Sequence, residues 1–165
     1  HFYFGKADGV KAAFLHHRIC EDRYNAGGGG KLSTVYDAIG AAQVAKASFA
    51  GMRMLHHVRD HVPIWPFDPC PAAGSLVVEI YTSIAARAAG RPKGRSKMRD
   101  AQALNAALAM LGSAPHAGVM PDDHGADAIV TAAWMRNSAR DPHLWSPAML
   151  TPEIARTEGW TFGIV

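Results

Sequence analysis

The sequence predicts an α/β protein, and three observations lead to that prediction. Apolar residues make up 48% of the 165 residues and charged residues 19%, a mixture typical of a globular domain with its own core. Two segments, Val62–Phe67 and Leu76–Tyr81, have the composition of β-strands. Alanine-rich segments with helical spacing follow the second one. Because strands alternate with helices, we expect a mixed sheet flanked by helices.

The segments before the strands predict helices joined by a glycine connector. Apolar residues indicate a short helix over Gly9–Cys20, followed by a charged turn. Gly27–Gly30 is a run of glycines and predicts a flexible connector. Helical spacing returns over Ser33–Ile39 and over about Lys46–Asp60, where the apolar residues form a broad stripe.

The two strand segments differ in kind. Val62–Phe67 contains two prolines, which donate no hydrogen bond to a neighbouring strand, so it predicts a short or edge strand. Leu76–Tyr81 lacks polar alternation, which is typical of a parallel strand covered on both faces. The second prediction is the firmer of the two, because its run of branched residues contains no proline.

The C-terminal half predicts further helices and one extended end. Ser96 is the expected N-cap of a helix over Lys97–Leu111, with Gly112 just beyond its end. The other expected elements are helices over Ile84–Ala89, from just after Asp123 to about Ala139 and from Thr151, and an extended piece over Trp160–Ile164. Two or three strands make a thin sheet for so many helices. We therefore expect residues 1–165 to form a single domain that is the C-terminal part of a longer one, with the N-terminal strands missing from this chain.

Composition argues against several classes of protein. No apolar run approaches the roughly 20 residues that cross a bilayer, and His1–Lys6 lacks the features of a signal peptide, so we expect a cytoplasmic protein without membrane contact. Cys20 and Cys70 are too few and too far apart for a disulfide framework or a cysteine-rich zinc site. A net charge of +3 is too small by itself to indicate nucleic-acid binding.

Two familiar motifs fail on their spacing. A phosphate loop needs lysine directly before serine or threonine, whereas Leu32 separates Lys31 from Ser33. His57 and His61 have the spacing of a helical zinc pair, but the glutamate that a zinc protease needs is absent. We interpret the glycine run as an ordinary loop and the histidines as surface or half-buried side chains.

Glu79 is the first residue that packing alone does not explain. It lies in the apolar strand segment Leu76–Tyr81, where an unpaired carboxylate costs several kcal/mol. Ligands of open α/β sheets gather beyond the carboxyl ends of the strands, and Glu79 lies towards that end of its segment. The alternatives are a carboxylate that faces water and one that pairs with an arginine such as Arg87.

A second group of candidate residues opens the helix that follows Asp123. His124 and Asp127 are three residues apart, so both side chains project from one face. An acidic N-cap fully accounts for Asp122 or Asp123 without catalysis. Taken together with Glu79, however, these residues resemble the ligand set of a hard divalent cation such as Mg²⁺ or Mn²⁺. Two such ions could support phosphodiester hydrolysis.

Several motifs resemble the ribonuclease H-like superfamily. Its Holliday-junction resolvases have their last metal ligands in a His/Asp-x-x-Asp-Ala helix start, like His124 to Ala128. The segments Ala38–Val44, Ile64–Asp68, Val78–Tyr81 and Glu158–Gly163 are similar to a bacterial family of predicted nucleases in that superfamily.

The resemblance implies a metal-dependent nuclease, a hydrolase, with a ribonuclease H-like fold. It implies catalytic roles for Glu79, His124 and Asp127, with Glu79 as the middle acidic metal ligand and Asp127 with His124 as the late ligands. Asp123 is a further candidate ligand. Members of the superfamily begin with a strand that carries the first catalytic aspartate, and nothing before Val10 resembles it. We therefore expect either that an N-terminal part is missing from this sequence or that the protein is not an active nuclease of that type.

A basic segment follows Glu79 and predicts contacts with phosphates. It contains six cations and no acid, namely Arg87, Arg91, Lys93, Arg95, Lys97 and Arg99. We expect either a nuclease that uses these cations to hold DNA or RNA, or an inactive ribonuclease H-like domain that binds a protein or nucleic-acid partner. A phosphate-transfer enzyme on the related sugar-kinase-like fold is a third possibility, without a convincing phosphate loop. A solvated surface loop accounts equally well for the basic segment.

Overall fold

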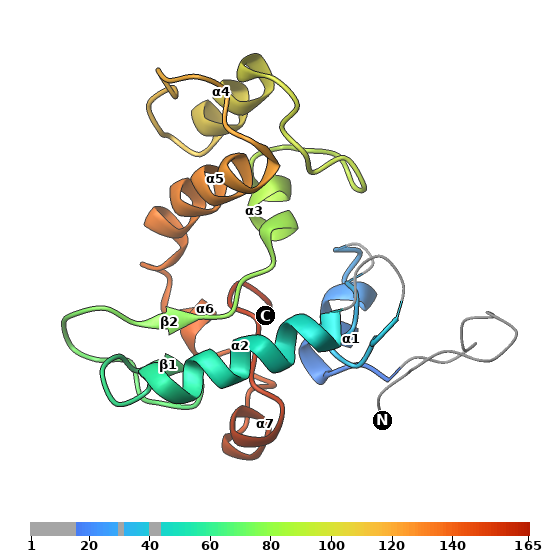
Figure 1. Cartoon of the computed structure of the whole chain (residues 1–165), viewed down its shortest axis with the longest axis vertical. Coiled ribbons are helices and arrows are strands. Elements are labelled where there is room, and N and C mark those ends of the chain that lie inside the picture. The colour runs from blue at the N-terminus through green and yellow to red at the C-terminus, as the bar shows by residue number, and fades with distance from the viewer. Residues whose placement is uncertain (1–15, 30–31, 40–43) are drawn as a thin grey trace, which may run out of the picture. The chain divides into compact units, whose positions relative to one another are not determined.

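The computed structural model describes residues 16–29, 32–39 and 44–165. The chain divides into two compact units (Figure 1). Unit 1 contains the described residues up to Glu79 together with Ala148–Val165, and unit 2 contains Ile80–Pro147. Strands and helices are both present, so the α/β class is confirmed. The expectation of a single domain over residues 1–165 stays a prediction.

Unit 1 is built on a small parallel sheet. Strand β1 (Ile64–Trp65) pairs in parallel with strand β2 (Val77–Val78), as the unalternated valine-rich segment predicts. Both valines of β2 are only half-buried. The prediction that both faces of this strand are covered is therefore only partly met. Beyond β2, Thr161 forms a parallel bridge with Glu79, and the Phe162 N–H donates to the Glu79 carbonyl at 2.9 Å. The extended C-terminal piece therefore lies directly beside the end of β2.

The core of unit 1 gathers around the aromatic residues of the C-terminal piece. Trp160 and Phe162 are almost fully buried, and the Phe162 ring meets the Trp65 ring edge-on at 5.8 Å between centroids. An edge-on pair of this kind contributes about 1 kcal/mol beyond its buried area. Helix α7 (Pro152–Thr157) precedes this piece and begins as predicted, because the Thr151 hydroxyl accepts from the Ile154 N–H.

Two predicted helices of unit 1 differ from the structure. Helix α1 spans Ile19–Ala26, where a charged turn was expected, and the predicted helix Gly9–Cys20 lies mostly outside the described residues. The predicted helix Ser33–Ile39 is wrong, because this segment forms a turn and irregular structure and contains no helical residue. The Thr34 hydroxyl accepts from the Tyr36 N–H, and the Asp37 carboxylate accepts from the Ile39 N–H. Such local side-chain contacts compete with helix formation.

Helix α2 (Val44–Val58) confirms the helix predicted over Lys46–Asp60 but leaves its apolar stripe uncovered. Ala45 is its one buried residue. Phe49, Met52 and Met54 are 50%, 54% and 67% exposed. Several apolar side chains of α2 are therefore exposed in the structure.

Unit 2 consists of helices. Helix α5 (Asp123–Ser138) packs against α3 (Thr82–Ala88) and α4 (Ala101–Met110), and these three lie together in Figure 1. Its apolar core contains Leu104, Leu108, Val130 and Trp134, among others. A short helix, α6 (Pro142–Trp145), follows. Across the described residues no helix is both long and apolar enough to cross a membrane.

The helix caps of unit 2 are acidic. The Asp122 carboxylate accepts from the Gly125 N–H at 2.7 Å, which confirms an acidic N-cap for α5. The Asp100 carboxylate caps α4 in the same way, at 2.7 Å from the Ala103 N–H. The expected cap at Ser96 is therefore wrong, and α4 begins four residues later than predicted, at Ala101. Gly112 adopts a positive φ of 65° just after α4, as its predicted place beyond the helix end implies.

Candidate functional site

Glu79, which follows β2, is held by an arginine. The Arg18 guanidinium donates two hydrogen bonds to the Glu79 carboxylate, from Nη1 to Oε2 at 2.8 Å and from Nη2 to Oε1 at 2.5 Å. The Thr161 hydroxyl donates a further hydrogen bond to Oε1. An arginine that grips both carboxylate oxygens forms one of the strongest charge-assisted contacts in proteins. Of the three alternatives for Glu79, an arginine pair is therefore present, with Arg18 as the arginine.

Arg18 serves more than one carboxylate. Its side chain is only 6% exposed, whereas Glu79 keeps 45% of its side chain exposed. The Arg18 Nε donates to Glu21 Oε1 at 3.0 Å, and the Glu158 carbonyl accepts from Nη1 at 3.3 Å. Glu21 is buried as well, at 1%. Because a buried charge needs such partners, the cluster joins the start of α1, the end of β2 and the C-terminal piece.

Arg18 and Glu79 each favour the charged form of the other. Desolvation acts to raise the pKa of Glu79, but the hydrogen bonds and charge of Arg18, with the Thr161 hydroxyl, outweigh it and hold that pKa below its usual value. Burial acts to lower the pKa of Arg18, and Glu79 outweighs it in the opposite direction. Both side chains are therefore charged at neutral pH, and the Glu79 carboxylate is already neutralised.

The acids of α5 also meet a cation, within unit 2. The Lys97 Nζ lies 2.8 Å from Asp127 Oδ2 and 3.8 Å from Asp123 Oδ2. The Thr82 hydroxyl adds a long hydrogen bond to Asp127 Oδ2 at 3.4 Å. The hydrogen bond to Asp127 raises the pKa of Lys97, so the lysine stays protonated. His124 is exposed on the same helix start.

The fit of these residues to a divalent metal can be judged from their present partners. Among residues 16–29, 32–39 and 44–165, no three His, Cys, Asp or Glu side chains form a group that could hold a metal ion. Asp123 and Asp127 converge on one point, but the Lys97 ammonium is there. Glu79 belongs to unit 1 and has Arg18 as its cation. With these partners the acids do not fit a divalent ion, and their role as metal ligands stays a prediction.

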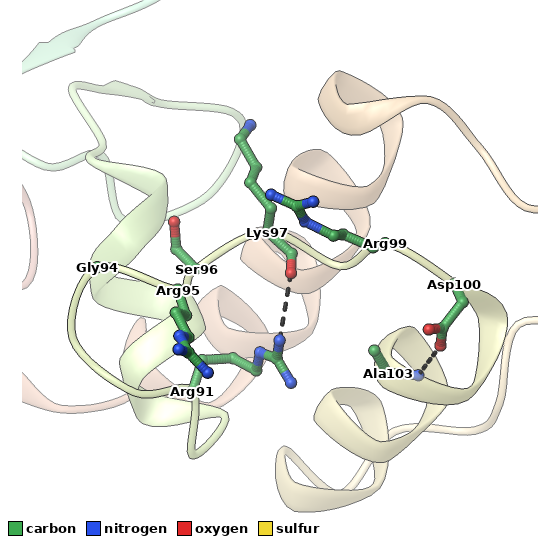
Figure 2. Close-up of a pocket in the computed structure, with 8 residues that line it drawn as sticks. All are labelled: Arg91, Gly94, Arg95, Ser96, Lys97, Arg99, Asp100 and Ala103. Carbon is green, nitrogen blue, oxygen red and sulfur yellow. Dashed lines mark hydrogen bonds between the residues drawn. The ribbon is translucent and has the colours of Figure 1, made fainter.

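The basic segment forms a cavity of about 570 Å³ in unit 2. Figure 2 shows its lining, which consists of the loop before α4 and the first turn of that helix. The lining residues are Arg91, Gly94, Arg95, Ser96, Lys97, Arg99, Asp100 and Ala103. Four of the six predicted phosphate-binding cations therefore line one cavity. The other two, Arg87 and Lys93, are exposed beside it in the chain.

The walls of the cavity are held by backbone contacts. The Arg91 Nη2 donates to the Lys97 carbonyl at 3.3 Å, which closes the loop on itself (Figure 2). Gly90 and Gly94 have φ values of 80° and 75°, a region that favours glycine, so the loop depends on both. The one acid of the lining, Asp100, is engaged as the cap of α4. The cavity is therefore electropositive.

Sequence reasoning missed Arg18, the residue that organises unit 1. The sequence around Arg18 offers one indication of its role, because Glu21 follows three residues later. That spacing is typical of a hydrogen bond at the start of a helix. The contact with Glu79 spans 61 positions and the contact with Thr161 spans 143. Contacts over such separations leave no pattern in a single sequence, so this cluster could be found only from the structure.

The chain was compared with known protein families, curated proteins and solved structures, and none of them matches it. The described fold is an α/β arrangement with a two-stranded parallel sheet. The ribonuclease H-like fold stays a prediction.

Proposed function

We propose that this chain binds the phosphate backbone of nucleic acid through the basic cavity of unit 2. The observation that carries the proposal is that Arg91, Arg95 and Arg99 line one cavity of about 570 Å³. Phosphate oxygens are the usual partners of arginine and lysine at such surfaces, and arginine can hold two oxygens at once. The proposed ligand is therefore a polyanion.

The charge state of the lining supports this proposal. In the described part of the chain, the salt bridges do not involve Arg95 or Arg99. These two guanidinium groups therefore keep their charge available for a ligand. Asp100 is the one acid of the lining, so the arginines outnumber it. A phosphate in the cavity would meet net positive charge.

The extent of the basic surface favours nucleic acid over a single small phosphate. Cations recur from Arg87 to Arg99 without an intervening acid, which suits a ligand that carries a phosphate on every nucleotide. No aromatic residue lies in this segment, so base stacking does not contribute. We expect binding that depends on salt and only weakly on sequence, to DNA or RNA.

A metal-dependent nuclease of the ribonuclease H-like type is the second candidate function. The observation that favours it is the convergence of Asp123 and Asp127 on one cation. In this candidate Asp123 and Asp127 would hold Mg²⁺ or Mn²⁺, His124 would assist, and the ion would supply a means to activate water. The ion would have to replace Lys97 as the partner of these two acids. If the ion does not replace this partner, the chain is an inactive domain of the same type.

Fluorescence anisotropy with labelled DNA and RNA, single- and double-stranded, tests the first proposal. We expect the double variant Arg95→Ala/Arg99→Ala to bind at least about tenfold more weakly, because each phosphate contact contributes about 1 kcal/mol or more. Arg140→Ala is the matched control, since Arg140 is an exposed arginine of the same unit outside the cavity. Equal affinities for the two variants would overturn the proposal.

Cleavage of the same substrates with Mg²⁺ or Mn²⁺ tests the second candidate. A nuclease loses activity in both Glu79→Gln and Asp127→Asn. Binding without cleavage by the unaltered protein supports the inactive domain. Equal cleavage by all three proteins would point to a contaminant and would rule out these acids as the active site.

A further inference from the structure

Unit 1 contains a groove that the proposed function does not use. It has a volume of about 610 Å³ and is lined by α2, by β1 with the turn that follows it, and by α7. Met52, Leu55, Ile64 and Phe67 provide apolar surface in it. Met52 and Phe67 are 54% and 43% exposed. The groove is thus an open apolar trough in a unit separate from the basic cavity.

The apolar surface continues along α2 outside the groove. Phe49, Met52 and Leu55 are spaced three residues apart and so follow one side of the helix. Phe49 is 50% exposed although it does not line the groove. The stripe from Phe49 to Leu55 is about 9 Å long at the rise of an α-helix. A polypeptide segment laid along α2 could follow this line of apolar side chains beyond the groove.

The lining of the groove also contains two arginines. Arg59 and Arg156 both line it, together with His56. No salt bridge of the described residues involves either arginine. The single acid of the lining, Asp68, accepts from the Ile64 N–H at 2.9 Å and is already engaged. The complementary ligand therefore combines apolar side chains with acidic ones.

We propose that this groove is a docking site for an acidic amphipathic segment of another protein. Apolar side chains of the partner fill the space beside Met52, and its carboxylates meet Arg59 and Arg156. A second copy of this chain fits less well, because a symmetric pair of grooves would bring these arginines near one another. Nucleic acid fits less well because the floor is apolar.

The first test uses two synthetic helical peptides of about 18 residues, or five turns. Both have leucine along one face, and the remaining positions are glutamate in one peptide and lysine in the other. We expect saturable anisotropy changes with the glutamate peptide and at least about tenfold weaker binding of the lysine peptide. Equal binding of the two peptides, or binding of neither, would overturn the proposal.

Matched variants then locate the site. We expect Met52→Ser to weaken binding of the glutamate peptide at least about fivefold, since buried apolar anchors dominate such interfaces. Met54→Ser is its control, because Met54 is an exposed methionine of the same helix that does not line the groove. Arg59→Glu/Arg156→Glu should abolish binding, whereas Arg53→Glu, also on α2, should not.

Three further results would contradict the proposal. One is an equal effect of Met52→Ser and Met54→Ser in proteins that circular dichroism shows to be folded. Another is a dimer in light scattering that Met52→Ser dissociates, which would make a second copy the occupant. The third is displacement of the glutamate peptide by a labelled oligonucleotide that Arg95→Ala/Arg99→Ala still binds, which would assign the groove to nucleic acid.

Discussion

Arg18 grips both oxygens of the Glu79 carboxylate across 61 positions of the chain. The same buried guanidinium contacts Glu21, so one arginine neutralises two acids of unit 1. The sequence indicates that Glu79 needs a partner, and in the structure that partner is Arg18. Any other cation that binds Glu79 must therefore displace Arg18.

Replacement of Arg18 should therefore destabilise unit 1 strongly. Arg18→Ala leaves Glu21 buried without its cation and Glu79 unpaired, and we expect a loss of about 3 kcal/mol in the free energy of unfolding. Urea unfolding followed by circular dichroism measures it. Arg53→Ala is the control, because Arg53 is exposed on α2. A loss of less than about 1 kcal/mol, the range of surface ion pairs, would show that the cluster contributes little.

The ionisation of Glu79 should appear in the pH dependence of stability. The pKa of Glu79 lies below its usual value of 4.5 in the folded protein. A lowered pKa stabilises the fold above the usual value, and this contribution disappears as the pH falls through the folded pKa. Between pH 6 and pH 3 we expect the unaltered protein to lose stability relative to Glu79→Gln, with the difference developing below about 4.5. Parallel curves for the two proteins would contradict the prediction.

The two adjacent acids at the start of α5 should differ in their effect on stability. Asp122 is the N-cap and accepts from the Gly125 N–H, so Asp122→Ala should cost about 1 kcal/mol. Asp123 is 63% exposed and 3.8 Å from Lys97, so Asp123→Ala should cost less than about 0.5 kcal/mol. Thermal or urea unfolding of both variants measures the difference. Similar costs would mean that the cap does not form.

Removal of Lys97 should expose the acid pair of α5 to other cations. In Lys97→Met the carboxylates of Asp123 and Asp127 lose their shared ammonium. We expect Mn²⁺ to bind this variant more tightly than the unaltered protein in titration calorimetry, because two converging carboxylates attract a hard cation. Lys97→Met/Asp127→Asn is the control and should lose the gain. If Lys97→Met binds Mn²⁺ no better, the two acids serve only to position the lysine.

Local features of the fold were predictable because they rest on neighbours in the chain. The helices α2 and α5, strand β2 and the cap at Thr151 follow from short patterns that need no distant partner. The start of α4 was misplaced because Ser96 and Asp100 are both acceptable caps, and only the loop around the basic cavity decides between them. The turn at Thr34 was read as helix because apolar spacing does not register side-chain contacts with the backbone.

The candidate sites were predictable to different degrees. Asp123 and Asp127 lie four residues apart at one helix start, so their closeness to each other could be predicted. The cations of the basic segment are likewise neighbours in the chain, so their grouping around one cavity could be predicted. The cations that neutralise the acids could not, since Arg18 approaches Glu79 from 61 residues away and Lys97 approaches Asp127 from 30 residues away. The groove beside Met52 also needs three separate elements to form.

The salt dependence of nucleic-acid binding tests the central proposal most directly. Lys97 is paired with Asp127, so the cations available to phosphates are the three arginines of the cavity. If each of them neutralises a phosphate, the logarithm of the binding constant should fall with the logarithm of salt concentration with a slope of about −2 to −3. Arg95→Ala/Arg99→Ala should reduce the magnitude of that slope by about 2, while Arg140→Ala leaves it unchanged. An unchanged slope in the double variant would show that nucleic acid does not bind at this cavity.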